Sequence, residues 1–183
     1  RELEKVRKEV ERLIKEIKDL NKRAHDETKT RIDRIREKNE KVHEESKRLI
    51  REIEELLRRK GGESEEVVRE IEKILDRIRR ESERASEESR KELEDIKRRS
   101  KEASDRSRKI LEEIRRTIEE VLREGAVTEE VIKEVEKRLD ELRKESKKLL
   151  DDDRRLIEKL KEESRRLLEE DRRLIKELKE KVK

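Results

Sequence analysis

The 183-residue sequence contains no cysteine, proline, methionine, phenylalanine, tyrosine or tryptophan, and only three glycines. Without cysteine, no disulfide pattern indicates a redox compartment. Without aromatic rings, the chain lacks the stacking platforms with which proteins bind single-stranded nucleic acid. It also lacks an apolar run long enough to cross a bilayer or to serve as a signal peptide. We therefore expect a soluble protein with no targeting signal.

Charged residues make up 61% of the chain and hydrophobic residues only 27%, far from the composition of an average globular domain. The 58 basic and 54 acidic residues nearly cancel, to a net charge of +4, and the two signs are interleaved. This interleaving argues against nucleic acid or a membrane surface as a partner. The apolar residues expected in the core are restricted to Leu, Ile, Val and Ala, which suggests residues chosen by rule.

Glycine divides the chain into three segments of similar length, at Gly61-Gly62 and at Gly125. Ser64 and Thr128 follow these glycines and precede acidic residues, an arrangement typical of helix N-caps. Between the turns, apolar residues recur every three or four positions, which predicts helices over residues 1–60, 65–124 and 129–183. At 1.5 Å per residue each helix is about 85 Å long. Short connections make sequential helices antiparallel.

A repeat of 18 residues runs through all three segments and is clearest near the end of the chain. Residues 145–162 read ESKKLLDDDRRLIEKLKE and residues 163–180 read ESRRLLEEDRRLIKELKE. Eighteen residues are five helical turns, so a repeated side chain returns to the same face of a straight helix. The persistent apolar stripe argues against disorder or isolated helices. The sequence therefore predicts an all-α fold, a long untwisted antiparallel three-helix bundle that forms one elongated domain over residues 1–183.

Polar residues interrupt the apolar stripe in the middle of each predicted helix, and they repeat at the same interval. Eight pairs lie where the stripe predicts burial: Asn21/Asn39, His25/His43, Thr28/Ser46, Ser82/Ser100, Ser86/Ser104, Ser89/Ser107, Ser146/Ser164 and Asp153/Asp171. All of these residues except Ser89, Ser107, Ser146 and Ser164 are assigned to the buried polar networks predicted below.

A register inferred from the two turns places polar residues of different helices level with one another. It places His25 level with Ser100 and Asp153, and it places the pairs Asn21/Ser104, His43/Ser82, His43/Asp171 and Asn39/Ser86 level as well. We interpret each repeat as a buried hydrogen-bond network built around His and Asp. Such a network makes most misaligned packings costly, because buried polar groups need partners. The alternative is that these positions are solvated faces where the stripe is interrupted.

The same residues do not make a convincing catalytic or metal site. Ser, His and Asp at one level suggest a hydrolytic triad, but the sequence has no glycine-rich elbow or oxyanion hole. Zinc needs three or four ligands, whereas each level offers one His and one Asp. We therefore predict no enzymatic activity, no catalytic residue, no cofactor, no metal and no small-molecule substrate.

The restricted alphabet, the 18-residue repeat and the internal Ser, Asn, His and Asp layers resemble de novo designed straight helical bundles with buried hydrogen-bond networks. This resemblance covers the whole chain and implies a very stable rod with a structural purpose. The leading hypothesis is thus a monomeric three-helix scaffold. The alternative is a binding component that forms a homo-oligomer or accepts a designed partner helix, with a pH response through its His layers.

Overall fold

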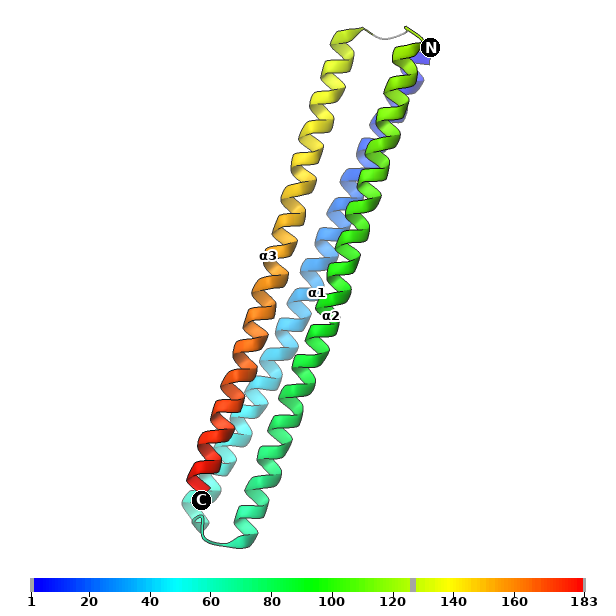
Figure 1. Cartoon of the computed structure of the whole chain (residues 1–183). Helices are drawn as coiled ribbons and strands as arrows, with labels where there is room; N and C mark the ends of the chain where they lie inside the picture. The colour runs from blue at the N-terminus through cyan, green and yellow to red at the C-terminus, as the bar shows by residue number, and fades with distance from the viewer. Residues whose placement is uncertain (1, 126–127, 183) are drawn as a thin grey trace. The chain divides into compact units, whose positions relative to one another are not determined.

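The computed structural model describes residues 2–125 and 128–182, with side chains from residue 4 onward. Three helices account for nearly all of these residues: α1 over Glu2–Lys60, α2 over Glu65–Arg123 and α3 over Glu129–Val182 (Figure 1). The described ranges contain no strand. The predicted all-α class and three-helix bundle are confirmed, and the helix boundaries at the two turns lie within one residue of their predicted positions. The predicted helix ends at residues 1 and 183 lie outside the described residues. None of the described helices combines the length and apolar content of a membrane span.

The helix ends use the glycine and capping chemistry expected from the sequence. Gly61 has a φ of 73° and donates its backbone N–H to the Leu57 carbonyl at 3.0 Å. Gly125 takes the same left-handed conformation, with a φ of 70°. This region of φ is strained for residues with a Cβ, so glycine ends both helices without that cost. The carbonyls of Ser64 and Thr128 accept the first hydrogen bonds of α2 and α3, as N-cap residues do.

The chain forms two compact units, each with a segment of all three helices. Unit 1 comprises residues 1–30 and 95–156, and unit 2 comprises residues 31–94 and 157–183. Within each unit, α1 and α3 run parallel and α2 runs against them. In unit 2, for example, Asn39 and His43 of α1 bond to Ser164 and Asp171 of α3, in the same order along both helices. The organisation of residues 1–183 as one domain stays a prediction.

An aliphatic core holds each unit together. The buried cluster of unit 1 consists of Val10, Leu13, Ile14, Ile17, Leu111, Ile114, Leu139 and Leu142. The buried cluster of unit 2 consists of Leu49, Ile50, Ile53, Leu56, Val67, Ile71, Leu75, Ile78, Ile175 and Leu178. Burying one such side chain stabilises the fold by roughly 1.5–3 kcal/mol. Because these clusters exclude water, a polar side chain buried beside them is costly unless it has a hydrogen-bond partner in the protein.

Candidate functional site

In unit 1, Asn21 joins the three helices through its side-chain amide. Its Nδ2 donates to Ser146 Oγ of α3 at 2.6 Å, and its Oδ1 accepts from Ser107 Oγ of α2 at 2.7 Å. The amide thus uses both its donor and its acceptor side, and each bond leads to a different helix. Ser107 is itself only 3% exposed. One asparagine therefore favours a single axial position of α1 relative to both α2 and α3 in unit 1.

Unit 2 repeats this arrangement one 18-residue period later. Asn39 Nδ2 donates to Ser164 Oγ at 2.9 Å, and Asn39 Oδ1 accepts from Ser89 Oγ at 2.9 Å. The bonded residues of α1 and α3 are 125 positions apart in both units. The sequence repeat thus reproduces the same pattern of donors and acceptors in each unit.

The second polar layer of unit 1 pairs a histidine with an aspartate. The Nδ1–H of His25 donates to Asp153 Oδ1 at 2.6 Å, since an ionised carboxylate can only accept. The Asp153 side chain is 6% exposed and the His25 side chain is 22% exposed. Burial raises the pKa of Asp153, while the hydrogen bond and the charge of His25 lower it and the neighbouring Asp152 raises it further. Burial dominates because the Asp153 carboxylate, at 6% exposure, loses more hydration than the contact with His25 replaces.

The equivalent layer of unit 2 is more deeply buried and has more partners. His43 Nδ1 donates to Asp171 Oδ1 at 3.2 Å, and Ser82 Oγ of α2 donates to Asp171 Oδ2 at 2.6 Å. The other ring nitrogen of His43, Nε2, lies 3.8 Å from Glu170 Oε2. A doubly protonated His43 would thus direct each N–H toward a carboxylate. In unit 1, the position equivalent to Glu170 is Asp152, one methylene shorter, and no ion pair between Asp152 and His25 is present among the described residues.

Each asparagine bonds to a serine about one helical turn away from the serine that the inferred register places level with it. The register placed Asn21 level with Ser104, whereas Asn21 bonds to Ser107. Asn39 likewise bonds to Ser89 instead of Ser86. The physical reason is that every Cα–Cβ bond leans toward the N-terminus of its own helix. In antiparallel helices the two side chains lean toward each other only when their Cα atoms are offset along the axis.

The remaining predicted residues lie in or beside the core without joining these bonds. Thr28 is 4% exposed, Ser46 is fully buried and Ser100 is 8% exposed, while Ser86 and Ser104 are half-buried. Ser100 forms no hydrogen bond to Asp153 among the described residues, although its repeat partner Ser82 bonds to Asp171. The Ser46 hydroxyl is the one buried side-chain oxygen in the described part of the chain that has no hydrogen-bond partner.

Four serines that form these bonds lie at positions predicted to be buried but outside the predicted networks: Ser89, Ser107, Ser146 and Ser164. Their recurrence at 18 residues was the available signal. The register inferred from the two interhelix connections places each of these serines about one helical turn away from the asparagine that it contacts.

A small polar cavity lies in unit 2 between the asparagine and histidine layers. Its volume is about 20 Å³, and its polar lining comes from Asn39, His43, Ser82, Ser86, Ser164 and Asp171. That volume suffices for a single water molecule with several hydrogen-bond partners. It is too small for an organic substrate.

The order of the polar groups in unit 2 does not match a hydrolytic triad. In a triad the histidine lies between serine and aspartate, so that it can take the serine proton. Here Asp171 lies between Ser82 and His43, and the Ser82 hydroxyl is directed at a carboxylate. The described residues also contain no group of three or more His, Cys, Asp or Glu side chains placed to hold a metal ion. The arrangement can fix positions and exchange protons.

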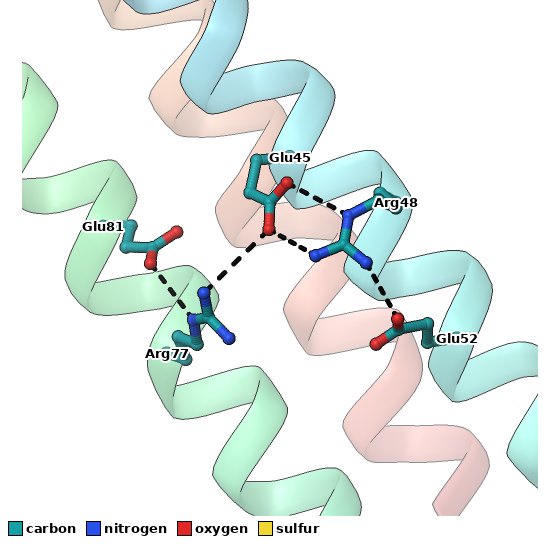
Figure 2. Close-up of polar contacts among 5 residues, drawn as sticks. All are labelled: Glu45, Arg48, Glu52, Arg77 and Glu81. Carbon is teal, nitrogen blue, oxygen red and sulfur yellow. Dashed lines mark hydrogen bonds and ion pairs between the residues drawn. The ribbon is translucent and has the colours of Figure 1, made fainter.

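Outside the core of unit 2, a chain of ion pairs connects α1 to α2 (Figure 2). Arg48 bonds to Glu45 at 2.6 Å and to Glu52 at 2.9 Å, while Arg77 of α2 bonds to Glu81 at 3.1 Å and lies 4.0 Å from Glu45. The hydrogen bond from Arg48 lowers the pKa of Glu45. Solvent screens such exposed pairs, so they contribute little to stability. Their alternating signs offer no concentrated charge to a ligand.

The fold and the buried layers define a class, that of three-helix bundles with hydrogen-bonded polar layers in an aliphatic core. A solved structure described as a "Computationally designed three helix bundle" is similar to this chain, with a TM-score of 0.52 and 25% sequence identity. The similarity covers 99% of this chain and 86% of the other. The resemblance to de novo designed helical bundles is thereby confirmed. No protein-family model and no curated protein matches the sequence.

Proposed function

We propose that the chain is a structural scaffold, a monomeric three-helix bundle that is specified by its two polar networks and has no catalytic activity. The observation that carries this proposal is that each asparagine bonds to both other helices of its own chain. Asn21 and Asn39 each use donor and acceptor in this way. The networks therefore have their partners without a second molecule.

The surface supports the monomeric state. Leu122, at 44% exposure, is the one large apolar side chain that the described residues expose. Stable homodimers bury extensive apolar surface, and a single exposed leucine is far from that. Sedimentation equilibrium from low to high micromolar concentration should give the monomer mass of 22.5 kDa throughout. A mass that doubles with concentration would contradict the proposal and favour the homo-oligomer.

A second experiment tests whether the polar networks select a single packing of the three helices. Asn21→Leu with Asn39→Leu removes both amide layers and replaces them with apolar groups. We expect equal or higher resistance to denaturant, because apolar replacement of a buried polar layer is often neutral or stabilising. We also expect new oligomers or several sets of NMR peaks, since misaligned packings no longer leave polar groups unpaired.

A matched control changes the same helix without touching a polar group. Ile17→Leu with Ile35→Leu alters two buried positions that are also one repeat apart, at 0% and 2% exposure. This control should remain monomeric with one set of peaks. If the asparagine variant behaves in the same way, the networks do not specify the fold.

A pH response is a second candidate function, favoured by the contacts of the histidines. Each imidazole bonds to a buried aspartate, and His43 has a carboxylate near both nitrogens. Protonation changes the charge and the donor count of an imidazole in the physiological range. The test is the unfolding midpoint of the parent, measured between about pH 5 and 8. A His25→Asn, His43→Asn variant should show a flatter profile, and identical profiles would end this candidate.

A further inference from the structure

A second, apolar cavity lies in unit 1, apart from both polar networks. Its volume is about 210 Å³. The walls come from all three helices: Val6 and Val10 of α1, Ile118 and Val121 of α2, and Val131 and Val135 of α3. The cavity continues the unit 1 core, in which the neighbouring Ile114 is fully buried.

The side chains around this cavity explain why it stays open. All six are β-branched, so each has a strongly preferred χ1 rotamer and cannot swing inward to fill the space. Five of them are valines, whereas the adjoining core is mainly leucine and isoleucine, which reach farther. Val6 and Val135 are half-buried, which leaves a route from solvent to the interior.

The charges at the rim select against an ionic occupant. Two cations, Arg7 and Arg138, are balanced by two anions, Glu11 and Glu134. Arg138 Nη1 already lies 3.7 Å from Glu11 Oε1. The rim therefore has no net charge with which to attract an anion or a cation, and the six wall residues have aliphatic side chains that offer no polar atom to orient a polar molecule.

We propose that this cavity is a binding site for a small neutral hydrocarbon with a single ring, of the size of benzene or toluene. Aliphatic cavities of about 150 Å³ hold benzene, and this one is somewhat larger and open on one side. With seven non-hydrogen atoms, toluene can reach a dissociation constant of about 1 mM within the known efficiency of very small ligands.

The absence of aromatic residues from the chain gives this proposal a clean spectroscopic test. The chain has no Phe, Tyr or Trp ring, and its two imidazoles, His25 and His43, are bonded in the polar layers, so a methyl shift that grows with added toluene comes from the ring of the ligand. We would titrate the isotopically labelled methyl groups of valine and isoleucine with toluene and record their NMR shifts. Saturable shifts should appear at the methyls of Val10, Val121 and Val135. The core methyls of unit 2, such as Ile53 and Ile71, should not move.

Two variants separate a built site from general partitioning into apolar surface. Val6→Leu with Val135→Leu adds two methylenes to the cavity and should weaken toluene binding at least fivefold. Val68→Leu makes the same change at a half-buried valine of unit 2 and should leave binding unaltered. Circular dichroism would check that each variant keeps the helical content of the parent.

Cyclohexane provides an independent arm because it has no ring current but a similar volume. It should displace toluene and reverse the shifts. Shifts that fail to saturate, that are equally large in unit 2, or that survive in the filled variant would overturn the proposal. None of these outcomes bears on the scaffold function, which depends on the oligomeric state.

Discussion

Ser46→Ala should stabilise the protein, although it removes a residue from a polar repeat. The Ser46 side chain is fully buried, and its hydroxyl has no hydrogen-bond partner. A buried hydroxyl without a partner loses its hydration and receives no protein bond in return. Alanine keeps the Cβ and removes only the oxygen, so the surrounding core need not rearrange.

The expected gain follows from two terms with the same sign. Removing the unpaired hydroxyl recovers about 1–3 kcal/mol of desolvation free energy. Alanine also favours the helix over serine by up to about 0.5 kcal/mol. The small void left by one oxygen atom partly offsets these terms. We expect the free energy of unfolding to rise by about 1–3 kcal/mol.

Ser82→Ala is the matched control, because it is the same substitution at a buried position of the same unit. The Ser82 hydroxyl donates to Asp171 at 2.6 Å, and a hydrogen bond to a charged group contributes roughly 1.5–3 kcal/mol. Its loss outweighs the same gain in helix propensity, so this variant should be destabilised. The two substitutions should thus have opposite signs.

Guanidinium unfolding followed by far-ultraviolet circular dichroism measures both effects, since the chain has no aromatic fluorophore. The midpoint should rise for Ser46→Ala and fall for Ser82→Ala. The reasoning is refuted if Ser46→Ala lowers the midpoint as much as Ser82→Ala does, because the Ser46 hydroxyl must then have a partner in solution.

Three further substitutions test the burial of Asp153 and the left-handed glycine of the first turn. Burial raises the folded-state pKa of Asp153 above 3.8, so the folded chain holds this proton more tightly than the unfolded chain. The stability that Asp153 contributes is then fully present below pH 3.8 and is lost as the pH rises through the folded-state pKa. The parent should therefore gain stability relative to Asp153→Asn as the pH is lowered through this window, and a relative loss in pH-dependent urea unfolding would contradict the burial argument. Gly61→Ala should cost about 1 kcal/mol, because Gly61 has a φ of 73°. Gly62→Ala should have little effect, because its added Cβ meets only Leu57 at 3.5 Å. An equal loss of stability at both positions would show that the positive φ of Gly61 is not the cause.

Much of the fold follows from local features of the sequence. Gly61 and Gly125 end helices because they tolerate positive φ, and Ser64 and Thr128 begin helices because their side chains suit the N-cap. These preferences act within a few residues, so the helix boundaries could be read without knowing the packing.

The polar layers were only partly predictable, because their bonds connect residues far apart in the chain. The turns were sufficient to place His25 near Asp153 and His43 near Asp171, where level residues do meet. They were not sufficient for the asparagines. The lean of side chains in antiparallel helices moves the contact of Asn21 from Ser104 to Ser107.

Helix geometry depends on the chain's own period and caps, so the three helices, their ends at the turns and the 18-residue spacing of the polar groups all follow from the order of the residues. Which polar groups have hydrogen-bond partners depends on how the helices pack. Ser82 and Ser100 are equivalent in sequence, yet Ser82 bonds to an aspartate and Ser100 does not. A hydrogen bond depends on distances of tenths of an ångström between helices, and a repeat in the sequence does not specify those distances.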